Sequence, residues 1–281
     1  MSSNETLTQR AAMAHRMLHD CELCEHRCRV DRVSGERGFC KADASARVWR
    51  YWVDYAEERA LSPSLLIYLS GCDLRCDFCI SESNAFNAHQ GVRLTADWLD
   101  RLVDWGIEQE ARTLQWIGGE PTIHAAAILD ALSGCRQRLP IVWKSDFYGT
   151  PEVWQLLDSI VDTYVADFKF GNDGCAERIA GVRRYVEIVT RNLLDVASRG
   201  PLIVRHLLLP GHEQCCFVPI LEWLQRRLPH VPLSLRDGYL PRWRAGRHAE
   251  LSRPLTPDEG PRALALAADF GLNVVDGREN A

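Results

Sequence analysis

The chain has 281 residues, of which 46% are hydrophobic and 25% charged, and its formal net charge is −5. These proportions are typical of globular proteins and exclude overall disorder. There is no basic stripe of the kind that follows nucleic-acid phosphates, and no apolar run approaches the ~18 residues of a membrane span. The polar N-terminal segment Met1–Arg10 lacks the apolar core of a signal peptide. We therefore expect a soluble, cytoplasmic protein that binds neither nucleic acid nor membrane.

Cysteine is the unusual residue, with 11 in the chain. In a reducing compartment, clustered thiols more often serve as metal ligands or catalysts than as disulfides. The cysteines fall into an N-terminal group, a second group about thirty residues further on, and four scattered positions. The N-terminal group is Cys21, Cys24, Cys28 and Cys40, the second is Cys72, Cys76 and Cys79, and the scattered ones are Cys135, Cys175, Cys215 and Cys216.

The first sixty residues are expected to form a small domain of their own. An apolar stripe over residues 5–19 predicts a helix. Residues 20–60 carry turn signals at Gly35 and Gly38 and predict an irregular segment that a metal holds together. We therefore expect residues 1–60 to be an N-terminal helix followed by a four-cysteine metal-binding module.

From Ser62 onward, short apolar strands alternate with helices, which is typical of parallel βαβ units buried on both faces. Residues 61–281 are therefore expected to form an α/β fold, a partial or full parallel barrel with a C-terminal helix. In such barrels the chemistry lies at the C-terminal ends of the strands. Strands are predicted at 64–70, 113–117, 141–143, 163–168, 202–209, 233–235 and 272–275. Helices are predicted at 95–109, 123–132, from 150, after 168 with a break around Gly181, at 217–228 and from 256.

Two of these helices have recognisable start signals. Thr150 precedes Pro151, which predicts Thr as the N-cap and Pro at the first helical position. The segment Thr256-Pro-Asp-Glu259 predicts a capping box at the start of the last helix.

The second cysteine group lies directly after the first barrel strand, as Cys72-Asp-Leu-Arg-Cys76-Asp-Phe-Cys79. One short loop with three thiolates can hold a [4Fe-4S] cluster and leave one iron open. A structural zinc site is the alternative, but it requires four protein ligands and the sequence offers no fourth nearby.

This C-x3-C-x2-C spacing resembles that of the radical S-adenosylmethionine (SAM) superfamily. The resemblance implies a [4Fe-4S] cluster on Cys72, Cys76 and Cys79, with SAM on the open iron. It also implies an enzyme that cleaves SAM reductively to a 5′-deoxyadenosyl radical, which abstracts hydrogen from a substrate. A low-potential electron donor of the flavodoxin or ferredoxin type would be its partner.

Further motifs support this resemblance at the ends of later strands. Gly118 and Gly119 allow close backbone approach to a ligand, and the Glu120 carboxylate suits the SAM ammonium. The resemblance implies that this segment binds the SAM amino group. An ordinary glycine-rich turn with a solvated Glu is the alternative. Phe78 matches the aromatic position near the adenine, and core packing is its alternative.

Two charged residues end the fourth barrel strand. Asp167 and Lys169 share one face because side chains alternate along a strand. They could contact the ribose and the carboxylate of SAM, or form a simple surface ion pair.

The resemblance narrows to the activating enzyme of pyruvate formate-lyase and its uncharacterised relatives, and covers about residues 20–245. The resemblance does not identify the substrate. A glycine of a partner protein is one option, and a small molecule, a peptide or a different protein stays open. The resemblance also places Lys144 near the SAM carboxylate, where the activating enzyme carries an acid, although a solvated Lys is an equal alternative. The matching segments are 21–24 with 35–40, 69–76, 118–122, 165–175, 189–192 and 205–212.

The N-terminal thiols supply four ligands, which suit either a structural zinc ion or an auxiliary [4Fe-4S] cluster. Activating enzymes often carry extra clusters after the main cluster loop, whereas these cysteines precede the barrel. A different class of function, a non-enzymatic iron–sulfur or zinc protein that carries electrons or acts as a scaffold, is the competing interpretation. The SAM-binding motifs argue against it, because a carrier does not need them.

Cys175, Cys215 and Cys216 follow the fourth and fifth barrel strands, on the edge where the cluster and SAM are expected. Buried packing is one interpretation, because free Cys is among the most buried residues. The other is a catalytic role, as a hydrogen-atom donor, a covalent anchor or an extra metal ligand.

Overall fold

The computed structural model describes residues 3–56, 58–136 and 138–275. The chain divides into two compact units, of which the first comprises Met1–Asp73 and Ser83–Thr163 and the second Leu74–Glu82 and Tyr164–Ala281. The chain therefore passes between the units three times. The predicted N-terminal module lies within the first unit, so the predicted boundary after residue 60 does not coincide with this division. None of the helices in the described ranges is long and apolar enough to span a membrane.

The first unit is built on a sheet in which β2 (Ser64–Leu69), β4 (Thr113–Gly118) and β5 (Ile141–Ser145) run parallel and are almost fully buried. In the register of β2 with β4, Leu69 lies opposite Gly118. Because parallel strands end at the same edge of a sheet, the loops that follow these strands begin side by side. The strands of this unit are β1 (Arg47–Asp54), β2 (Ser64–Leu69), β3 (Val92–Arg93), β4 (Thr113–Gly118) and β5 (Ile141–Ser145).

The prediction of an irregular segment over residues 20–60 is wrong for β1, which pairs antiparallel with β2 and β3. Its side chains alternate poorly between buried and exposed, and a register irregularity interrupts the ladder between Val48 and Arg50. The period-2 signal that identifies a half-buried strand is therefore missing from its sequence.

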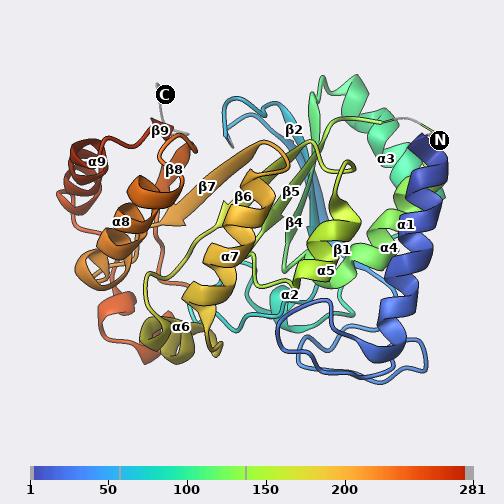
Figure 1. Ribbon diagram of the computed structural model, residues 1–281, viewed down its shortest axis with the longest axis horizontal. Helices are drawn as coiled ribbons and strands as arrows, with labels where there is room; N and C mark the ends of the chain where they lie inside the picture. Colours follow the sequence, from blue (N-terminus) through green and yellow to red (C-terminus); the bar gives the residue numbers. More distant parts are fainter. Residues whose placement is uncertain (1–2, 57, 137, 276–281) are drawn as a thin grey trace. The chain divides into compact units, whose positions relative to one another are not determined.

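Helices of the first unit pack on the sheet and on one another. The predicted first helix is confirmed as α1, whose apolar side chains Leu7, Ala11 and Ala14 are buried and which packs against α4 (Figure 1). The helices are α1 (Ser3–Met17), α2 (Ser83–Phe86), α3 (Ala96–Glu108), α4 (Ala125–Ser133) and α5 (Pro151–Leu157), with short 3₁₀ turns η1 (Leu18–Asp20) and η2 (Thr122–His124).

The start of α5 differs from the capping prediction. Pro151 is the first helical residue, as expected, but the Thr150 hydroxyl makes no capping bond and donates instead to the carbonyl of Glu22 at 2.8 Å. A tertiary hydrogen bond to the N-terminal module has replaced the local one.

The second unit contains parallel strands that pair in chain order, with Asp167 opposite Arg205. The strands are β6 (Thr163–Asp167), β7 (Leu202–Leu207), β8 (Leu233–Arg236) and β9 (Val274–Val275). The helices are α6 (Asp173–Ala180), α7 (Tyr185–Ala197), the π-helical η3 (Glu213–Phe217), α8 (Val218–Arg227), η4 (Ala245–Arg247), η5 (Glu250–Ser252) and α9 (Glu259–Asp269). The parallel strands of both units confirm the predicted α/β fold.

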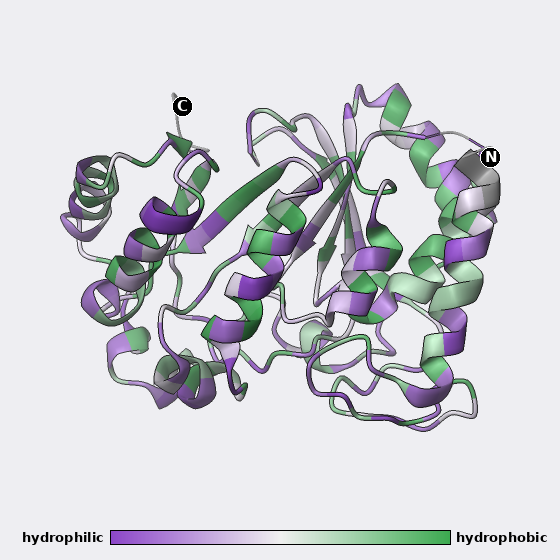
Figure 2. Cartoon of the chain, in the orientation of Figure 1, coloured by the Kyte–Doolittle hydropathy of each residue, from purple (hydrophilic) through white to green (hydrophobic). Residues whose placement is uncertain are grey.

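Helices of this unit are amphipathic. Hydrophobic and hydrophilic residues alternate around α7 in Figure 2, and its buried residues include Ile188 and Leu193. The predicted break near Gly181 is confirmed: this residue has φ +69° and ends α6 in the left-handed conformation that glycine adopts readily. The predicted capping box is half formed, because α9 begins only at Glu259, whose carboxylate accepts the Thr256 N–H at 2.7 Å.

Candidate functional site

Cys72 lies three residues beyond the end of β2, in the first unit. Its Sγ is 3.9 Å from Oδ2 of Asp146, which follows β5. The N–H of Asp146 in turn donates to the Glu120 carboxylate at 2.9 Å. The ends of three neighbouring parallel strands therefore bring these polar groups together.

The two glycines after β4 meet the segment that leads into Cys72. Gly118 has φ +116°, and a Cβ on Gly119 would lie 1.7 Å from the carbonyl oxygen of Gly71. The N–H groups of Gly119 and Glu120 donate to the carbonyls of Leu69 and Gly71 at 2.8 and 2.9 Å. The glycines are thus required by a close approach of two backbones, which is more specific than an ordinary turn.

Glu120 is a fully buried carboxylate with two backbone donors. Its oxygens accept the N–H groups of Thr122 and Asp146, each at 2.9 Å. Burial, followed by the nearby Asp146 carboxylate, raises the pKa of Glu120 to about 8. A cationic group such as the SAM ammonium would favour the ionised form, so this carboxylate fits the predicted role.

Cys76 and Cys79 belong to the short segment of the second unit that precedes α2. The N–H of Cys79 donates to the carbonyl of Cys76 at 3.2 Å, which closes a tight turn between them. The neighbouring N–H groups of Arg75 and Asp77 bind the carbonyls at the end of α6, each at 2.9 Å. Cys72, Cys76 and Cys79 are not joined by disulfide bonds, and a set of three thiols fits a cluster that has one open iron.

Phe78 is buried and packs edge-on against Phe170 and Tyr239, with ring centroids 6.2 and 6.3 Å away. Core packing therefore describes its contacts, and a contact with adenine stays a prediction.

Asp167 and Lys169 form the ion pair that was the alternative interpretation, with the ammonium 2.6 Å from Oδ2, and their contact with SAM stays a prediction. Arg205, opposite Asp167 on β7, adds a second cation at 3.2 Å from Oδ1. All three side chains are about one-fifth exposed, so they remain accessible to a ligand.

Lys144 is buried on β5, and its ammonium lies 3.4 Å from Oε2 of Glu58. Its contact with the SAM carboxylate stays a prediction. Asp146, two residues further along, is an acid at the same strand end that the sequence analysis did not single out.

The four N-terminal thiols line one cavity of about 10 Å³ in the first unit. A Cβ on Gly38 would lie 2.6 Å from Sγ of Cys28, which explains the glycine before Cys40. Burial raises the pKa of Cys24 and of Cys40. All four thiols therefore border one cavity, while a common metal group, whether zinc or a cluster, stays a prediction.

This N-terminal module also contacts the cluster loop within the first unit. The His26 ring donates from Nε2 to the carbonyl of Asp73, which follows Cys72, at 2.7 Å. The same ring stacks on Phe39, with centroids 3.8 Å apart. The module is therefore packed against the residue next to a predicted cluster ligand.

Three of the four scattered cysteines come together in the second unit, and Cys135 lies in the first. The Sγ atoms of Cys175 and Cys215 are 3.8 Å apart, and those of Cys215 and Cys216 are 4.0 Å apart. His212 joins the first two as a third possible ligand. His212 was not predicted to be a ligand, although it precedes Cys215 by only three residues.

Comparison with known proteins identifies the family. The model of the radical SAM superfamily matches residues 66–224, more than half of the chain, and includes the three-cysteine loop and the Gly-Gly-Glu segment. The chain belongs to the radical SAM superfamily. Membership implies an enzyme with a [4Fe-4S] cluster and SAM.

An uncharacterised protein of Methanocaldococcus jannaschii is 31% identical over 284 residues, which cover 96% of this chain and 80% of that protein. Two solved structures share the fold. SuiB of Streptococcus suis, bound to its precursor peptide SuiA, is 12% identical over 73% of this chain, with a TM-score of 0.55. TYW1 with a lysine–pyruvate adduct is 13% identical over 78% of this chain and 86% of its own, with a TM-score of 0.51. The chain spans about half (46%) of the SuiB chain.

Proposed function

We propose that this radical SAM enzyme cleaves SAM reductively and uses the resulting radical to abstract hydrogen from a polypeptide substrate. The observation that carries the proposal is the C-x3-C-x2-C loop beside the glycines and the buried Glu120 at the ends of adjacent parallel strands. When bound, the cluster would supply one electron to SAM, so that the sulfur–C5′ bond breaks to give methionine and a 5′-deoxyadenosyl radical.

The residues of the chain would act as follows. Cys72, Cys76 and Cys79 would hold the cluster. The Glu120 carboxylate would bind and orient the SAM amino group, and Asp167 with Lys169 would contact its ribose and carboxylate. The burial of Glu120 would limit access of water to the carboxylate that binds the ammonium.

A glycine of a partner protein is the proposed hydrogen source. Support comes from the resemblance to activating enzymes over residues 20–245, not from the low-identity structures. The proposed reductant is a flavodoxin or ferredoxin. The four cysteines ahead of the barrel distinguish this chain from those activating enzymes.

The test is anaerobic reconstitution with iron and sulfide, reduction with dithionite, and measurement of 5′-deoxyadenosine formed from SAM. Replacing Cys72, Cys76 and Cys79 together with Ala should abolish this product. Cys135→Ala is the matched control, because Cys135 is buried and lies 3.5 Å from Asp100, outside these motifs. Unchanged product in the triple variant would refute the proposal.

The substrate class needs a separate experiment. A candidate glycyl-radical protein is added to the reduced enzyme with SAM, and the mixture is examined by electron paramagnetic resonance. A glycine-centred radical on the added protein supports the activase role. Formation of 5′-deoxyadenosine without such a signal from any candidate would contradict the proposal that the substrate is a protein glycine. The proposal that the enzyme cleaves SAM would still hold.

A further inference from the structure

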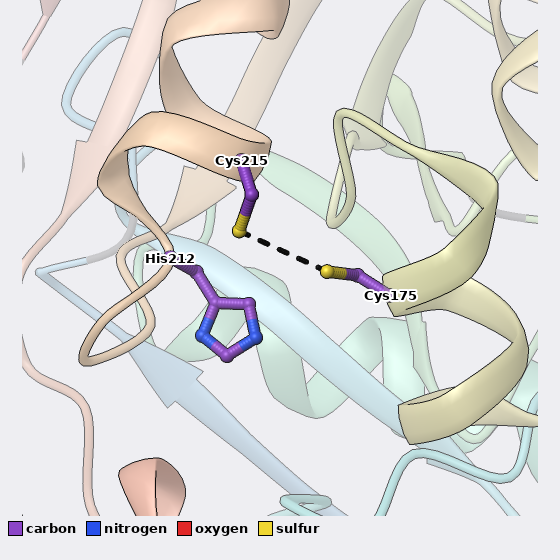
Figure 3. Close-up of side chains that lie close together, drawn as sticks. All are labelled: Cys175, His212 and Cys215. Atoms are coloured by element: carbon purple, nitrogen blue, oxygen red, sulfur yellow. Dashed lines mark hydrogen bonds between the residues drawn. The ribbon is translucent and has the colours of Figure 1, made fainter.

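Cys175, His212 and Cys215 form a compact group of ligand atoms in the second unit, all within 4.8 Å of one another. Figure 3 shows the three side chains pointing toward one another from α6 and from the segment around η3. We propose that they bind a zinc ion, separate from the [4Fe-4S] site.

The distance between the two sulfur atoms is the first argument. Two thiolates at about 2.3 Å from one tetrahedral zinc ion place their sulfurs about 3.8 Å apart. The observed separation of the Cys175 and Cys215 sulfurs is 3.8 Å. Two thiolates and one imidazole are also a donor set that zinc prefers, with a fourth position left open.

The backbone explains how residues forty positions apart reach this geometry. A Cβ on Gly171, just before α6, would lie 2.1 Å from the carbonyl oxygen of Cys216, so the two segments touch through a glycine. The N–H groups of Cys216 and Phe217 both donate to the His212 carbonyl, at 2.9 and 3.2 Å. The resulting π-helical turn is a feature often found at functional sites.

Asn172 supplies a hydrogen-bond donor to the sulfurs. Its Oδ1 accepts the N–H of Cys175 at 2.8 Å, which fixes the orientation of the amide. Its Nδ2 therefore faces Sγ of Cys175 at 3.2 Å and the carbonyl of Cys215 at 2.5 Å. Donors of this kind stabilise metal-bound thiolates and orient them.

His212 is held in the tautomer that a metal needs. Its Nδ1 lies 2.9 Å from the carbonyl of Pro210, which can only accept, so Nδ1 carries the proton. The lone pair is then on Nε2, 3.2 Å from the Arg178 guanidinium. A metal ion would replace that one hydrogen bond, while Arg178 keeps Glu250 and His248 as partners at 2.7 and 3.0 Å.

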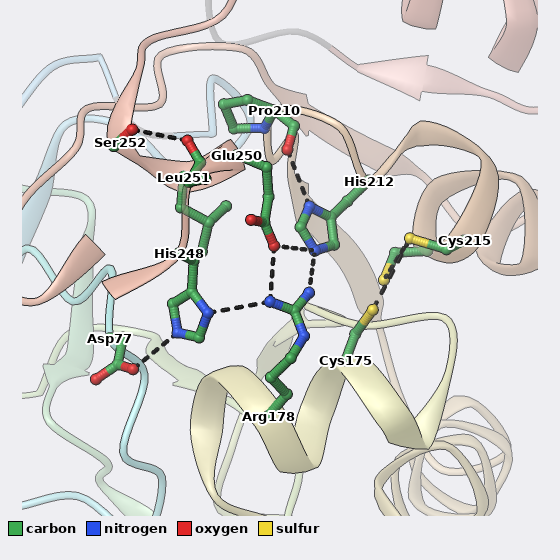
Figure 4. Close-up of polar contacts among 12 residues, drawn as sticks. Asp77, Cys175, Arg178, Pro210, His212, Cys215, His248, Glu250, Leu251 and Ser252 are labelled. Carbon is green, nitrogen blue, oxygen red and sulfur yellow. Dashed lines mark hydrogen bonds and ion pairs between the residues drawn. The ribbon is translucent and has the colours of Figure 1, made fainter. Parts of the chain in front are cut away.

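These polar contacts continue to the cluster loop within the same unit (Figure 4). His248 bridges Arg178 and the carboxylate of Asp77, with its Nε2 2.9 Å from Oδ2. Asp77 lies next to Cys76 in sequence. The proposed zinc site is therefore connected through side chains to the loop that carries two predicted cluster ligands.

The first test measures zinc per chain in the full-length, cluster-reconstituted protein after zinc addition and removal of excess metal. Cys175→Ser, Cys215→Ser and His212→Gln should each bind one zinc equivalent fewer than the parent. Cys135→Ser, a buried cysteine outside the group, should bind as much as the parent. Equal zinc in the parent and all three site variants would overturn the proposal.

The second test needs no variant. The parent is treated with iodoacetamide with and without zinc, and the labelled cysteines are mapped by mass spectrometry. Cys215 is exposed and should be labelled without zinc, and zinc should abolish labelling of both Cys215 and Cys175. Equal labelling in both samples, or a Cys175–Cys215 disulfide in place of free thiols, would contradict zinc binding. Neither readout depends on SAM cleavage, so the two proposals can fail separately.

Discussion

Glu120 is a buried side chain with two structural hydrogen bonds and a proposed role in binding the SAM ammonium. The fold aims two backbone N–H groups at its carboxylate, yet burial and the Asp146 carboxylate disfavour its charge and raise its pKa to about 8. At neutral pH the protonated form therefore dominates until a cation arrives. A site of this kind binds an ammonium group selectively, because the cation removes the cost of the buried charge.

The raised pKa gives a prediction for stability without SAM. Between about pH 4.5 and about pH 8 the folded chain holds a proton on Glu120 that the unfolded chain releases, so stability falls as the pH rises. Glu120→Gln should remove this contribution, at most about 1.4 kcal/mol per pH unit. Thermal unfolding of parent and variant across this range measures it. The exposed Glu108→Gln is the control, and parallel pH profiles for parent and Glu120→Gln would count against the prediction.

At the scale of elements, regular strands and helices were predictable where burial is continuous or strictly periodic. β2, β4 and the apolar face of α1 follow that rule. β1 was missed because its buried and exposed side chains do not alternate. Asn172 and Arg178 could not be assigned to a site from the sequence, because their partners are distant in the chain. Arg178 pairs with His212, and Asn172 with Cys216, each more than thirty residues away. The cysteine loop was predictable because its chemistry is local.

The contact between the β4 end and the β2 end predicts the effect of a single methyl group. In Gly119→Ala the new Cβ would overlap the Gly71 carbonyl, at 1.7 Å, so one backbone segment must shift. We expect a loss of about 1–3 kcal/mol of stability and reduced iron after reconstitution, because Gly71 directly precedes Cys72. Gly200→Ala, where nothing lies within 4 Å of the added Cβ, is the control. Normal iron content and stability in Gly119→Ala would contradict this prediction, because the backbone would then accommodate the added methyl group without loss.

At the scale of the whole molecule, each unit contains a buried histidine whose pKa is lowered by its burial. His124 in the first unit lies with Nε2 2.7 Å from the Ser70 carbonyl, and His206 in the second with Nδ1 2.7 Å from the Phe168 carbonyl. Burial lowers the pKa of each to about 4. Since the chain crosses between the units three times and neither is a continuous segment, we expect them to unfold in one cooperative transition.

This expectation can be tested through the two histidines. Below about pH 6.5 the unfolded chain gains a proton on each that the folded chain takes up only near pH 4, so stability is lost as the pH falls across that range. Each group contributes up to about 3 kcal/mol of this loss. His124→Gln and His206→Asn keep a donor at the bonded ring position and remove the titration. In scanning calorimetry both variants should flatten the pH dependence of the same single transition. Two transitions, each sensitive to only one of the substitutions, would mean that the units unfold independently despite their interleaved chain.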